Sequence, residues 1–515
     1  MLNNYLENLK SKNVGIIVNY FSKQFLNKYY ELYNIPTSNF VDYLSINNLN
    51  TIFIDNELFE VDHAWFKKEI NGLLAHAKLN NIDVIIIRNT DKPIRNVLLD
   101  YPAIEINVPR YEKNNKNRVQ LPVIVDETKF NPIDTVKSID ILYVSFSKIL
   151  RTKGIQSLNV MINPKREEFV FDEMSRKNFL ALFSKIKKAK CVYFYYVDEI
   201  DNVIIKYLEV IVGLQNSIPM YSSFTRKSEN AIIKEDIELM TNIVSLIGNK
   251  QMREKFVLPN QRKLFLNHTF MAKKDLFNSD TEVKPIPTSV ITSTNRKYNL
   301  SNYIQRLNSQ KLVEIQATLI THGFKLTKQE EDLIYDQLNK NIDLTIIPVE
   351  ESQPLGFCLN KAISNVKHDY VAKMDDDDYY FDNYLIDSWI SAKYSDADLV
   401  GKFSTFTYLG DSNIIISKHK NTHRKYHPFV MGATFFCKTS IMQKYMFSSL
   451  PTGEDSDFLR RIKEDKAKIY ADHPYNFCIY RSGDVGDHTW KISDLEYMRN
   501  AIIEDFNNPY EFISL

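Results

Sequence analysis

Short apolar runs that alternate with longer segments of mixed polarity constrain the fold of this 515-residue chain more than any other feature. In the first ~280 residues they predict strands at Val14–Val18, Thr51–Ile54, Asp83–Ile87 and Ile104–Ile106. Strands separated by segments long enough for a helix are typical of α/β proteins with parallel sheets. The pattern therefore predicts an α/β fold class.

A polar break at Tyr111–Arg118 interrupts this pattern, which then resumes. The second stretch predicts strands at Pro122–Val125, Asp140–Val144 and Cys191–Tyr196, and a helix at 202–213. The break is poor in helix and strand signals, as expected of a connection between two α/β lobes.

A second interruption, Asp280–Thr288, contains two prolines and no periodicity, so we expect a linker. A third α/β unit begins after it with a predicted strand at Ser289–Thr292. Because one hydrophobic core rarely serves so long a chain, we expect three domains. Their expected bounds are 1–118, 119–280 and 281–515.

Composition excludes several classes of protein. The 65 basic and 64 acidic residues leave a net charge of +1, which argues against a general nucleic-acid binder. The four cysteines form no CxxC pair, so neither a zinc site nor a disulfide framework is expected. The N-terminus lacks an apolar signal core and no apolar run could span a bilayer, so we expect a cytoplasmic protein.

The predicted helix Phe179–Lys190 has an apolar start and a basic end. It could attach peripherally to the anionic inner face of the cell membrane. It could equally be a packed helix whose lysines complement the helix dipole.

The acidic run Asp375-Asp376-Asp377-Asp378 follows the apolar stretch Tyr370–Ala372 after only Lys373 and Met374. A strand that ends this way places carboxylates at the carboxyl edge of a sheet, where α/β proteins bind ligands. Adjacent anions repel one another, and Mg²⁺ or Mn²⁺ takes oxygen ligands and bridges carboxylates to phosphates. Strand alternation puts Asp375 and Asp377 on the same side.

The alternative is a solvated acidic loop, which is the usual meaning of a run of like charges. The flanking apolar stretch and the predicted amphipathic helix Tyr384–Ala392 favour a site instead.

Two further segments suit the same edge. Ser293, Thr294 and Arg296 close the first strand of the third unit, where hydroxyls and a guanidinium suit phosphates and a base. A helix cap is the alternative. Gly356 and Asn360 lie just before and within a predicted helix and form a second candidate contact edge.

Gly453–Asp457 is an acidic turn before a helix. Asp455 or Glu454 could take a proton from a bound hydroxyl, or could simply stabilise the helix N-terminus. His488, in Gly486–Trp490, could complete a metal site or be structural.

In this order, these segments resemble the family 2 glycosyltransferases of the GT-A fold. The landmarks are SVITSTNR, a segment from Glu314 through Gly323, GFCLNKAI, DDDDYYFDNYL and GEDSDFLRR. The resemblance covers residues 289–515, and its specificity comes from order and spacing.

The resemblance implies a metal-dependent inverting glycosyltransferase that uses a nucleotide-sugar donor. Asp375 would lie near the ribose, Asp377 would bind the Mn²⁺ or Mg²⁺ that holds the diphosphate, and His488 would be a further ligand. Asp455 would be the catalytic base, with Glu454 beside it. Donor contacts would come from Ser293, Thr294, Arg296, Gly323, Gly356, Asn360, Asp375 and Asp376.

Relatives often carry a base-reading acidic pair where this chain has Thr321-His322-Gly323, so UDP is expected by default. The acceptor implied by the resemblance is a bacterial surface glycan, such as teichoic acid or a capsular polysaccharide.

The earlier part of the chain resembles two-lobed GT-B glycosyltransferases of the spore-maturation-protein class. The resemblance lies in Leu121–Pro132, in Ile205–Glu209 with a donor-contacting Glu209, and in Asn267–Thr269. Without a glycine-rich phosphate loop, this GT-B-like module is expected to be non-catalytic or acceptor-binding.

Three hypotheses remain open: one active site in the third domain, a bifunctional polymerase with two active modules, or a nucleotide-sugar-binding scaffold without catalysis. A phosphoryl- or nucleotidyltransferase would also use carboxylates and Mg²⁺, but the chain has no GxxxxGK[ST] loop. An oligomer is compatible with each of these hypotheses.

Overall fold

A computed structural model of the chain divides into two compact units, Met1–Thr281 and Glu282–Leu515, which are described separately. The structure describes residues 6, 13–18, 22–23, 26–56, 65, 69–88, 96–98, 100–106, 118–121, 123–145, 164–170, 176–195, 202–221, 243–271, 284–450, 452–482, 493–506 and 508–515. The expected boundary between residues 118 and 119 falls inside a strand of the first unit.

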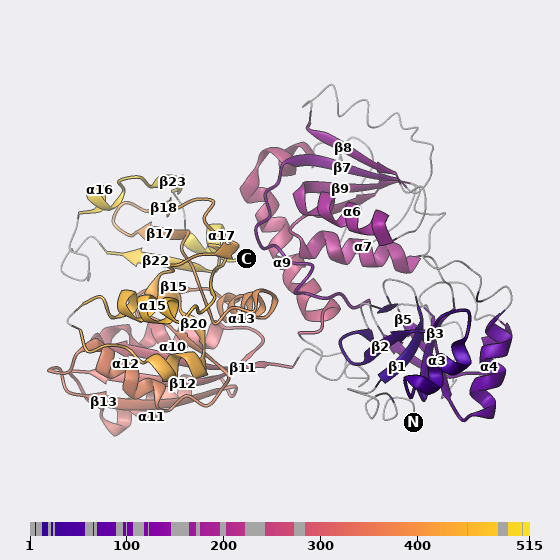
Figure 1. Cartoon of the computed structure of the whole chain (residues 1–515). Helices are drawn as coiled ribbons and strands as arrows, with labels where there is room; N and C mark the ends of the chain where they lie inside the picture. The colour runs from indigo at the N-terminus through magenta and orange to yellow at the C-terminus, as the bar shows by residue number, and fades with distance from the viewer. Residues whose placement is uncertain are drawn as a thin grey trace. The chain divides into compact units, whose positions relative to one another are not determined.

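The first unit begins with a six-stranded parallel sheet of order β2-β1-β3-β4-β5-β6 (Figure 1). Its strands are β1 (Asn13–Ile17), β2 (Glu31–Asn34), β3 (Thr51–Asp55), β4 (Asp83–Arg88), β5 (Ala103–Ile106) and β6 (Arg118–Leu121). Its helices are α3 (Phe40–Ile46), α4 (Ile70–Leu79) and the short 3-10 helix η2 (Asn96–Leu98). The four predicted strands are confirmed, whereas β2 and β6 were not predicted.

A four-stranded parallel sheet of order β10-β9-β7-β8 follows in the same unit. Its strands are β7 (Ile139–Ser145), β8 (Arg166–Val170), β9 (Ala189–Tyr195) and β10 (Ile218–Tyr221). Its helices are α6 (Arg176–Lys188), α7 (Asn202–Leu214) and α9 (Lys250–His268).

Two predictions for this part of the unit need correction. The strand predicted at 122–125 is absent from the described residues 123–125, where Val125 makes a single parallel bridge to Thr269. The predicted helix at 179–190 ends at Lys188, because Ala189 and Lys190 begin β9. The apolar face of α6 is buried within the unit, including Phe179 and Phe183, as the packed-helix interpretation requires.

The second unit contains a mixed eight-stranded sheet of order β13-β12-β11-β14-β20-β16-β21-β19. Its strands are β11 (Ile286–Thr294), β12 (Val313–His322), β13 (Ile342–Val349), β14 (Tyr370–Lys373), β16 (Leu399–Gly401), β19 (Lys425–Tyr426), β20 (Phe436–Lys438) and β21 (Ile469–Ala471). The first four are mutually parallel, and β20 runs antiparallel between β14 and β16.

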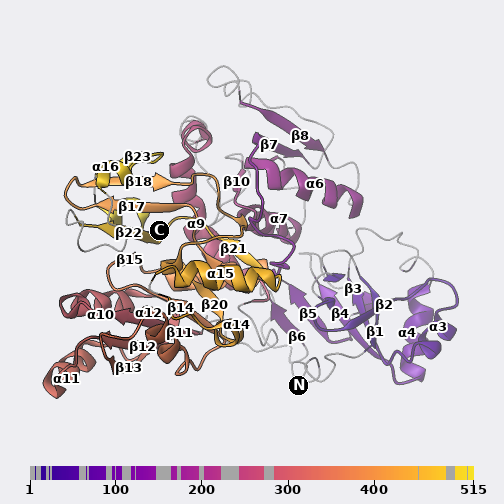
Figure 2. The same ribbon diagram turned by 60° about the vertical axis from the view of Figure 1, so that its left-hand side comes forward.

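A smaller five-stranded sheet of order β15-β22-β17-β18-β23 lies at one end of this unit in both views (Figures 1 and 2). Its strands are β15 (Tyr379–Tyr380), β17 (Thr405–Leu409), β18 (Ile414–Lys418), β22 (Phe477–Arg481) and β23 (Ile502–Asp505). The unit's helices are η4 (Lys297–Asn299), α10 (Leu300–Ser309), α11 (Lys328–Gln337), α12 (Leu355–Ile363), α13 (Tyr384–Ser395), η5 (Gly432–Thr434), α14 (Thr439–Tyr445), α15 (Glu454–Glu464), α16 (Asp494–Tyr497) and α17 (Pro509–Ile513).

Burial explains why β11 and β12 form the centre of the parallel half of the large sheet. Both are nearly continuous apolar or hydroxyl runs, as expected of parallel strands covered on both faces. Their core includes Ile291 and Ile320 and continues into helices α12, α14 and α15. The expected linker at 280–288 is shorter than predicted, since β11 begins at Ile286.

The order of the parallel strands locates a ligand-binding edge. From β11 the chain moves outward to β12 and β13, then returns to β14 on the opposite side of β11. Ligands bind in α/β sheets at such a switch point, outside the carboxyl ends of the strands. None of the described helices is both long and apolar enough to cross a membrane.

Candidate active site

The acidic run lies at this switch point, immediately after β14. The run itself is not a strand, since β14 ends at Lys373 and β15 begins at Tyr379, but its side chains alternate in burial: Asp376 and Asp378 are buried, whereas Asp375 and Asp377 are 37% and 31% exposed. The carboxylates of Asp375 and Asp377 are therefore available to a ligand, whereas those of Asp376 and Asp378 are part of the protein's interior.

Asp376 binds the carboxyl end of β11 to that of β14. One of its oxygens accepts hydrogen bonds from Thr294 Oγ1 at 2.7 Å and Asn299 Nδ2 at 3.3 Å, and the other accepts one from Arg296 Nη1 at 2.9 Å. Arg306 also donates to the Asp376 carbonyl oxygen. Both carboxylate oxygens of Asp376 thus accept hydrogen bonds from the protein itself. The contribution of Asp376 to a site is therefore to hold Thr294, Arg296 and Asn299 in position.

Asp378 connects the run to the smaller sheet. Its Oδ1 accepts a hydrogen bond from the backbone N–H of Tyr480 on β22, at 3.1 Å. Burial, with Asp377 and Asp375 nearby, raises the pKa of Asp378 well above its usual value.

The exposed pair, Asp375 and Asp377, carries more negative charge than its neighbours balance. Arg296 lies 3.1 Å from Asp377, yet burial and the adjacent Asp375 carboxylate still raise the pKa of Asp377. A divalent cation between these oxygens would relieve that repulsion, so the residues present fit Mn²⁺ or Mg²⁺. Among the described residues, no three His, Cys, Asp or Glu side chains gather closely enough to form a complete metal site.

Lys373, the last residue of β14, was not predicted as a site residue. Its side chain is 4% exposed, and its Nζ lies 2.8 Å from Asp375 Oδ1 and 3.5 Å from Asp455 Oδ2. Burial alone would lower its pKa, but Asp375, Asp455 and Glu454 together hold the pKa of Lys373 above its usual value. A charged residue inside the run Tyr-Val-Ala-Lys-Met was the sequence signal that could have identified it.

Asp455 lies in the first turn of α15, and Lys373 brings it to the acidic run. Burial, together with Asp375 and Glu454, raises the pKa of Asp455 to about 6, although Lys373 opposes this rise. Its Oδ1 is buried and has no hydrogen-bond partner within the described part of the chain. A buried acceptor without a donor is costly, so this oxygen is suited to a donor supplied by a ligand.

Gly432, in η5, leaves the space that the Asp455 carboxylate occupies. A Cβ at position 432 would lie 1.7 Å from Asp455 Oδ2, so any side chain there would displace the carboxylate. Tyr380 connects η5 to the acidic run, since its hydroxyl accepts from the Asp375 N–H and donates to the Ala433 carbonyl. Neither Gly432 nor Tyr380 was identified from the sequence, because the contacts that define them join distant segments.

The remaining acids of the Gly453–Asp457 turn have different surroundings. Glu454 is buried at the start of α15, and its negative charge helps to raise the pKa of Lys373. Asp457 accepts hydrogen bonds from Ser448, Arg460 and Arg461, and these hold its pKa at about 2. Asp457 is therefore a permanent anion that braces α15.

Gly356 and Asn360, both predicted to contact a donor, contact the segment after α14 instead. The Asn360 amide donates to the Phe447 carbonyl at 2.8 Å and accepts from the Phe447 N–H at 2.7 Å. A Cβ at Gly356 would lie 2.2 Å from the Ser448 carbonyl oxygen. Both residues thus let α12 pack closely against 447–448.

Two further predicted residues lie at the ends of neighbouring strands, and a third cannot be placed. Ser293 is half-buried near the end of β11 and hydrogen-bonds the Cys358 thiol. Gly323 follows β12 with φ of 83°, a conformation that glycine tolerates, and donates its N–H to Val349. His488 lies outside the described residues.

In the first unit the structure brings together two of the segments that the sequence singled out. His268 hydrogen-bonds the Val123 carbonyl through Nδ1 at 2.8 Å, and the Val125 N–H donates to the His268 carbonyl. Glu209, the third landmark, lies on α7 with 4% of its side chain exposed and pairs with Lys206 at 3.3 Å. It is buried rather than presented to a ligand.

No family model matches this sequence, and neither does any curated protein. Solved structures give weak matches. TarS from S. aureus is 16% identical over 38% of this chain and 37% of its own, with a TM-score of 0.31. A shorter TarS structure in complex with UDP is 18% identical over 38% of this chain and 61% of its own, with a TM-score of 0.30.

The mannosyltransferase PcManGT from Pyrobaculum calidifontis, in complex with GDP-Man and Mn²⁺, is 11% identical over 51% of this chain and 76% of its own. Its TM-score is 0.32. This chain thus spans less than two thirds of the TarS chains that it matches. TM-scores at this level do not establish a common fold, so the assignment of the site depends on its own residues.

Proposed function

We propose that the second unit is a metal-dependent inverting glycosyltransferase of the GT-A type. One observation carries the proposal: two partly exposed carboxylates, Asp375 and Asp377, lie at the sheet's switch point, and Lys373 joins Asp375 to a third partly exposed carboxylate, Asp455. This is the combination that a transfer from a nucleotide-sugar to a hydroxyl requires, namely a charge-balanced diphosphate site beside a base.

The topology of the unit supports the proposal. Strands β13, β12, β11 and β14 form the parallel half of the sheet, and the antiparallel β20 follows β14. The acidic run therefore lies between the parallel half, which we propose binds the nucleotide, and the segments that carry η5 and α15. Donor and acceptor would therefore meet where β14 ends.

For the donor, we propose that Asp375 and Asp377 hold the Mn²⁺ or Mg²⁺ ion on which the diphosphate binds. When bound, the ion would supply Lewis-acid stabilisation of the departing nucleoside diphosphate. Arg296, fixed by Asp376 and lying beside Asp377, would add a positive charge at the same oxygens. At the carboxyl edge of the sheet, the nucleoside part of the donor would contact Ser293, Thr294 and Gly323.

For the acceptor, we propose Asp455 as the general base. Lys373 holds Oδ2, so Oδ1 can accept the proton of the acceptor hydroxyl as its oxygen bonds to the anomeric carbon. The bond from that carbon to the diphosphate breaks on the opposite face, which inverts the configuration. A pKa of about 6 leaves Asp455 ionised at neutral pH yet basic enough to take a proton.

We propose UDP as the nucleotide and a bacterial surface glycan, such as teichoic acid or a capsular polysaccharide, as the acceptor. The first unit is proposed to be non-catalytic or acceptor-binding, because Glu209 is buried and paired with Lys206. This favours one active site over a bifunctional polymerase.

Release of UDP from a panel of UDP-sugars, with Mn²⁺, with Mg²⁺ and with EDTA, tests the proposal. Turnover should require the metal and fall by at least about a hundredfold in Asp377→Ala, because the diphosphate site is lost. Asp336→Ala, which removes an exposed carboxylate on α11, is the matched control and should keep full activity. Undiminished turnover in EDTA, or in Asp377→Ala, would refute the proposed mechanism.

A further inference from the structure

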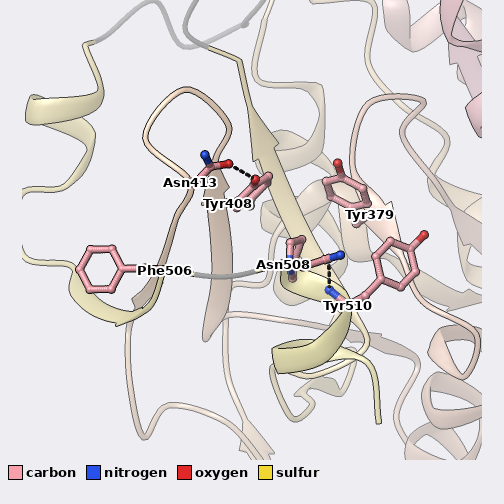
Figure 3. Close-up of a pocket in the computed structure, with 7 residues that line it drawn as sticks. Tyr379, Tyr408, Asn413, Phe506, Asn508 and Tyr510 are labelled. Carbon is pink, nitrogen blue, oxygen red and sulfur yellow. Dashed lines mark hydrogen bonds between the residues drawn. The ribbon is translucent and has the colours of Figure 1, made fainter.

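A pocket that the proposed chemistry does not use lies on the smaller sheet of the second unit. Its volume is about 520 Å³, and it is lined by Tyr379, Tyr408, Asn413, Phe506, Asn508, Pro509 and Tyr510. Figure 3 shows the rings of Tyr379 and Tyr510 on one side and that of Phe506 on the other. The volume falls in the range of about 300–1,000 Å³ that small-molecule sites occupy.

The aromatic wall of this pocket is built in advance of any ligand. The Tyr379 ring lies 6.3 Å from that of Tyr510 and 6.5 Å from that of Tyr408, both in edge-to-face arrangements. Phe381 supports Tyr510 from behind, with ring centroids 4.8 Å apart. Rings that pack on one another in this way keep fixed orientations, so the pocket loses little entropy on binding.

Polar groups of the same residues remain available in the pocket. Asn413 Oδ1 accepts from the Tyr408 hydroxyl at 2.6 Å, and Asn508 Oδ1 accepts from the Tyr510 backbone N–H at 2.9 Å. These bonds orient both amides, and neither NH₂ group donates a hydrogen bond to another described residue. The hydroxyls of Tyr379 and Tyr510 likewise make no hydrogen bond within the part of the chain that the structure describes.

This chemistry indicates the class of ligand. None of the described residues that line the pocket has a charged side chain, which disfavours a phosphate or a carboxylate as the group bound there. Aromatic faces bordered by amide and phenol groups suit a molecule with apolar C–H faces and a rim of hydroxyls. A neutral sugar ring has both properties, whereas a lipid chain would leave the polar groups without partners.

The pocket adjoins the acidic run. Tyr379 follows Asp377 by two residues, so their Cα atoms are at most about 7 Å apart. Tyr480, whose N–H binds Asp378, also packs against Tyr379 with ring centroids 5.7 Å apart. The wall of the pocket is thus continuous along the chain with the acidic run, through Tyr379.

We propose that the pocket formed by Tyr379, Tyr408 and Tyr510 with Asn413 and Asn508 binds a neutral pyranose residue of the acceptor glycan. Its role as an acceptor subsite rests on the proposed function. Binding of the sugar itself does not, because it requires no turnover.

Saturation-transfer NMR on the full-length protein tests this inference. The probes are methyl β-D-glucopyranoside, methyl α-D-galactopyranoside and methyl N-acetyl-β-D-glucosaminide, since ring protons that face a tyrosine receive saturation. At least one glycoside should bind the unaltered protein, and its dissociation constant should rise at least fivefold in Tyr510→Ala. Tyr510 is 49% exposed, so its loss should leave the fold intact.

Tyr335→Ala is the matched control, because Tyr335 on α11 is similarly exposed, at 43%, and lies outside the pocket. It should leave glycoside binding unchanged. Asn413→Leu serves as a second pocket variant, which removes a donor and should also weaken binding.

Three results would overturn the inference: no glycoside signal in the unaltered protein, equal signals in Tyr510→Ala and Tyr335→Ala, or displacement of the glycoside by UMP. The last would show that the pocket holds the nucleotide base. UDP release measured in parallel separates the two claims. Glycoside binding without any donor turnover would refute the transferase, and turnover without glycoside binding would refute only the pocket.

Discussion

At the scale of single residues, two cation–anion arrangements, each around one buried residue, organise the candidate site: Asp376 in one and Lys373 in the other. Arg296 and Thr294 fix Asp376, and Lys373 joins Asp375 to Asp455. The sequence pointed to the acidic residues and to their alternation, because both can be read from neighbouring positions in the chain, although the run lies after the end of β14 rather than within a strand. It could not predict Lys373 as the link, since Asp455 lies 82 positions further along the chain and only the folded sheet brings it near.

Replacing Lys373 by Met should shift the pH dependence of transfer. Asp455 acts as a base only when ionised, so kcat/KM of the unaltered protein should rise about tenfold per pH unit up to about pH 6 and then level off. Removing the adjacent cation disfavours the carboxylate, so the midpoint should move at least about one pH unit higher. A pH series of UDP release measures this shift.

Lys311→Met is the control for that series, because Lys311 is an exposed lysine paired with Asp382. Its profile should match that of the unaltered protein, and Asp455→Asn should lack the rising limb. If the pH profile of Lys373→Met matched that of the unaltered protein, Lys373 would not affect the pKa of the proposed base, Asp455.

At the scale of elements, the proposed base, Asp455, is positioned where η5 and α15 meet. Gly453 begins α15 with φ of 86°, Arg461 of that helix donates to the Tyr445 and Met446 carbonyls, and Gly432 of η5 packs directly against Asp455. The helix at 454 was recognisable from its acidic first turn. The contact between this helix and Gly432 could not be predicted, because nothing in the sequence around Gly432 indicates that a side chain there would clash with Asp455.

Gly432→Ala should impair catalysis more than stability. The added Cβ would lie 1.7 Å from Asp455 Oδ2, so the carboxylate must move by more than 1 Å, and kcat should fall about a hundredfold. Single-turnover transfer, UDP affinity and the melting temperature would be measured together. Gly248→Ala is the control, since a Cβ there meets nothing within 4 Å. Full activity in Gly432→Ala would mean that Asp455 is not the base.

At the scale of the whole molecule, the chain consists of two units with separate hydrophobic cores. The α/β class and most of the parallel strands were predictable, because each is a buried apolar run between turns. The five-stranded sheet was not, since it assembles short strands as distant as Tyr379 and Ile502. Such pairings leave no local signal in the sequence.

Two units with separate cores should unfold in two calorimetric transitions rather than one. UDP with Mn²⁺ should stabilise only the transition of the second unit, by about 2.7 kcal/mol at a ligand concentration of 100 times Kd. Scanning calorimetry with and without ligand measures both effects. Asp377→Ala should abolish the ligand-dependent increase while leaving the other transition where it was. A ligand effect on both transitions would contradict separate unfolding.

The hydrogen bonds of the Tyr380 hydroxyl determine which substitutions near this site leave its backbone held in place. It joins the acidic run to η5 through two backbone groups, the Asp375 N–H and the Ala433 carbonyl. Because neither partner is a side chain, substitutions at 375 or 433 leave this brace in place. The chemistry at position 375 can therefore diverge in descendants of this chain without loosening the scaffold, whereas Tyr380→Phe would loosen it while leaving every proposed ligand unaltered.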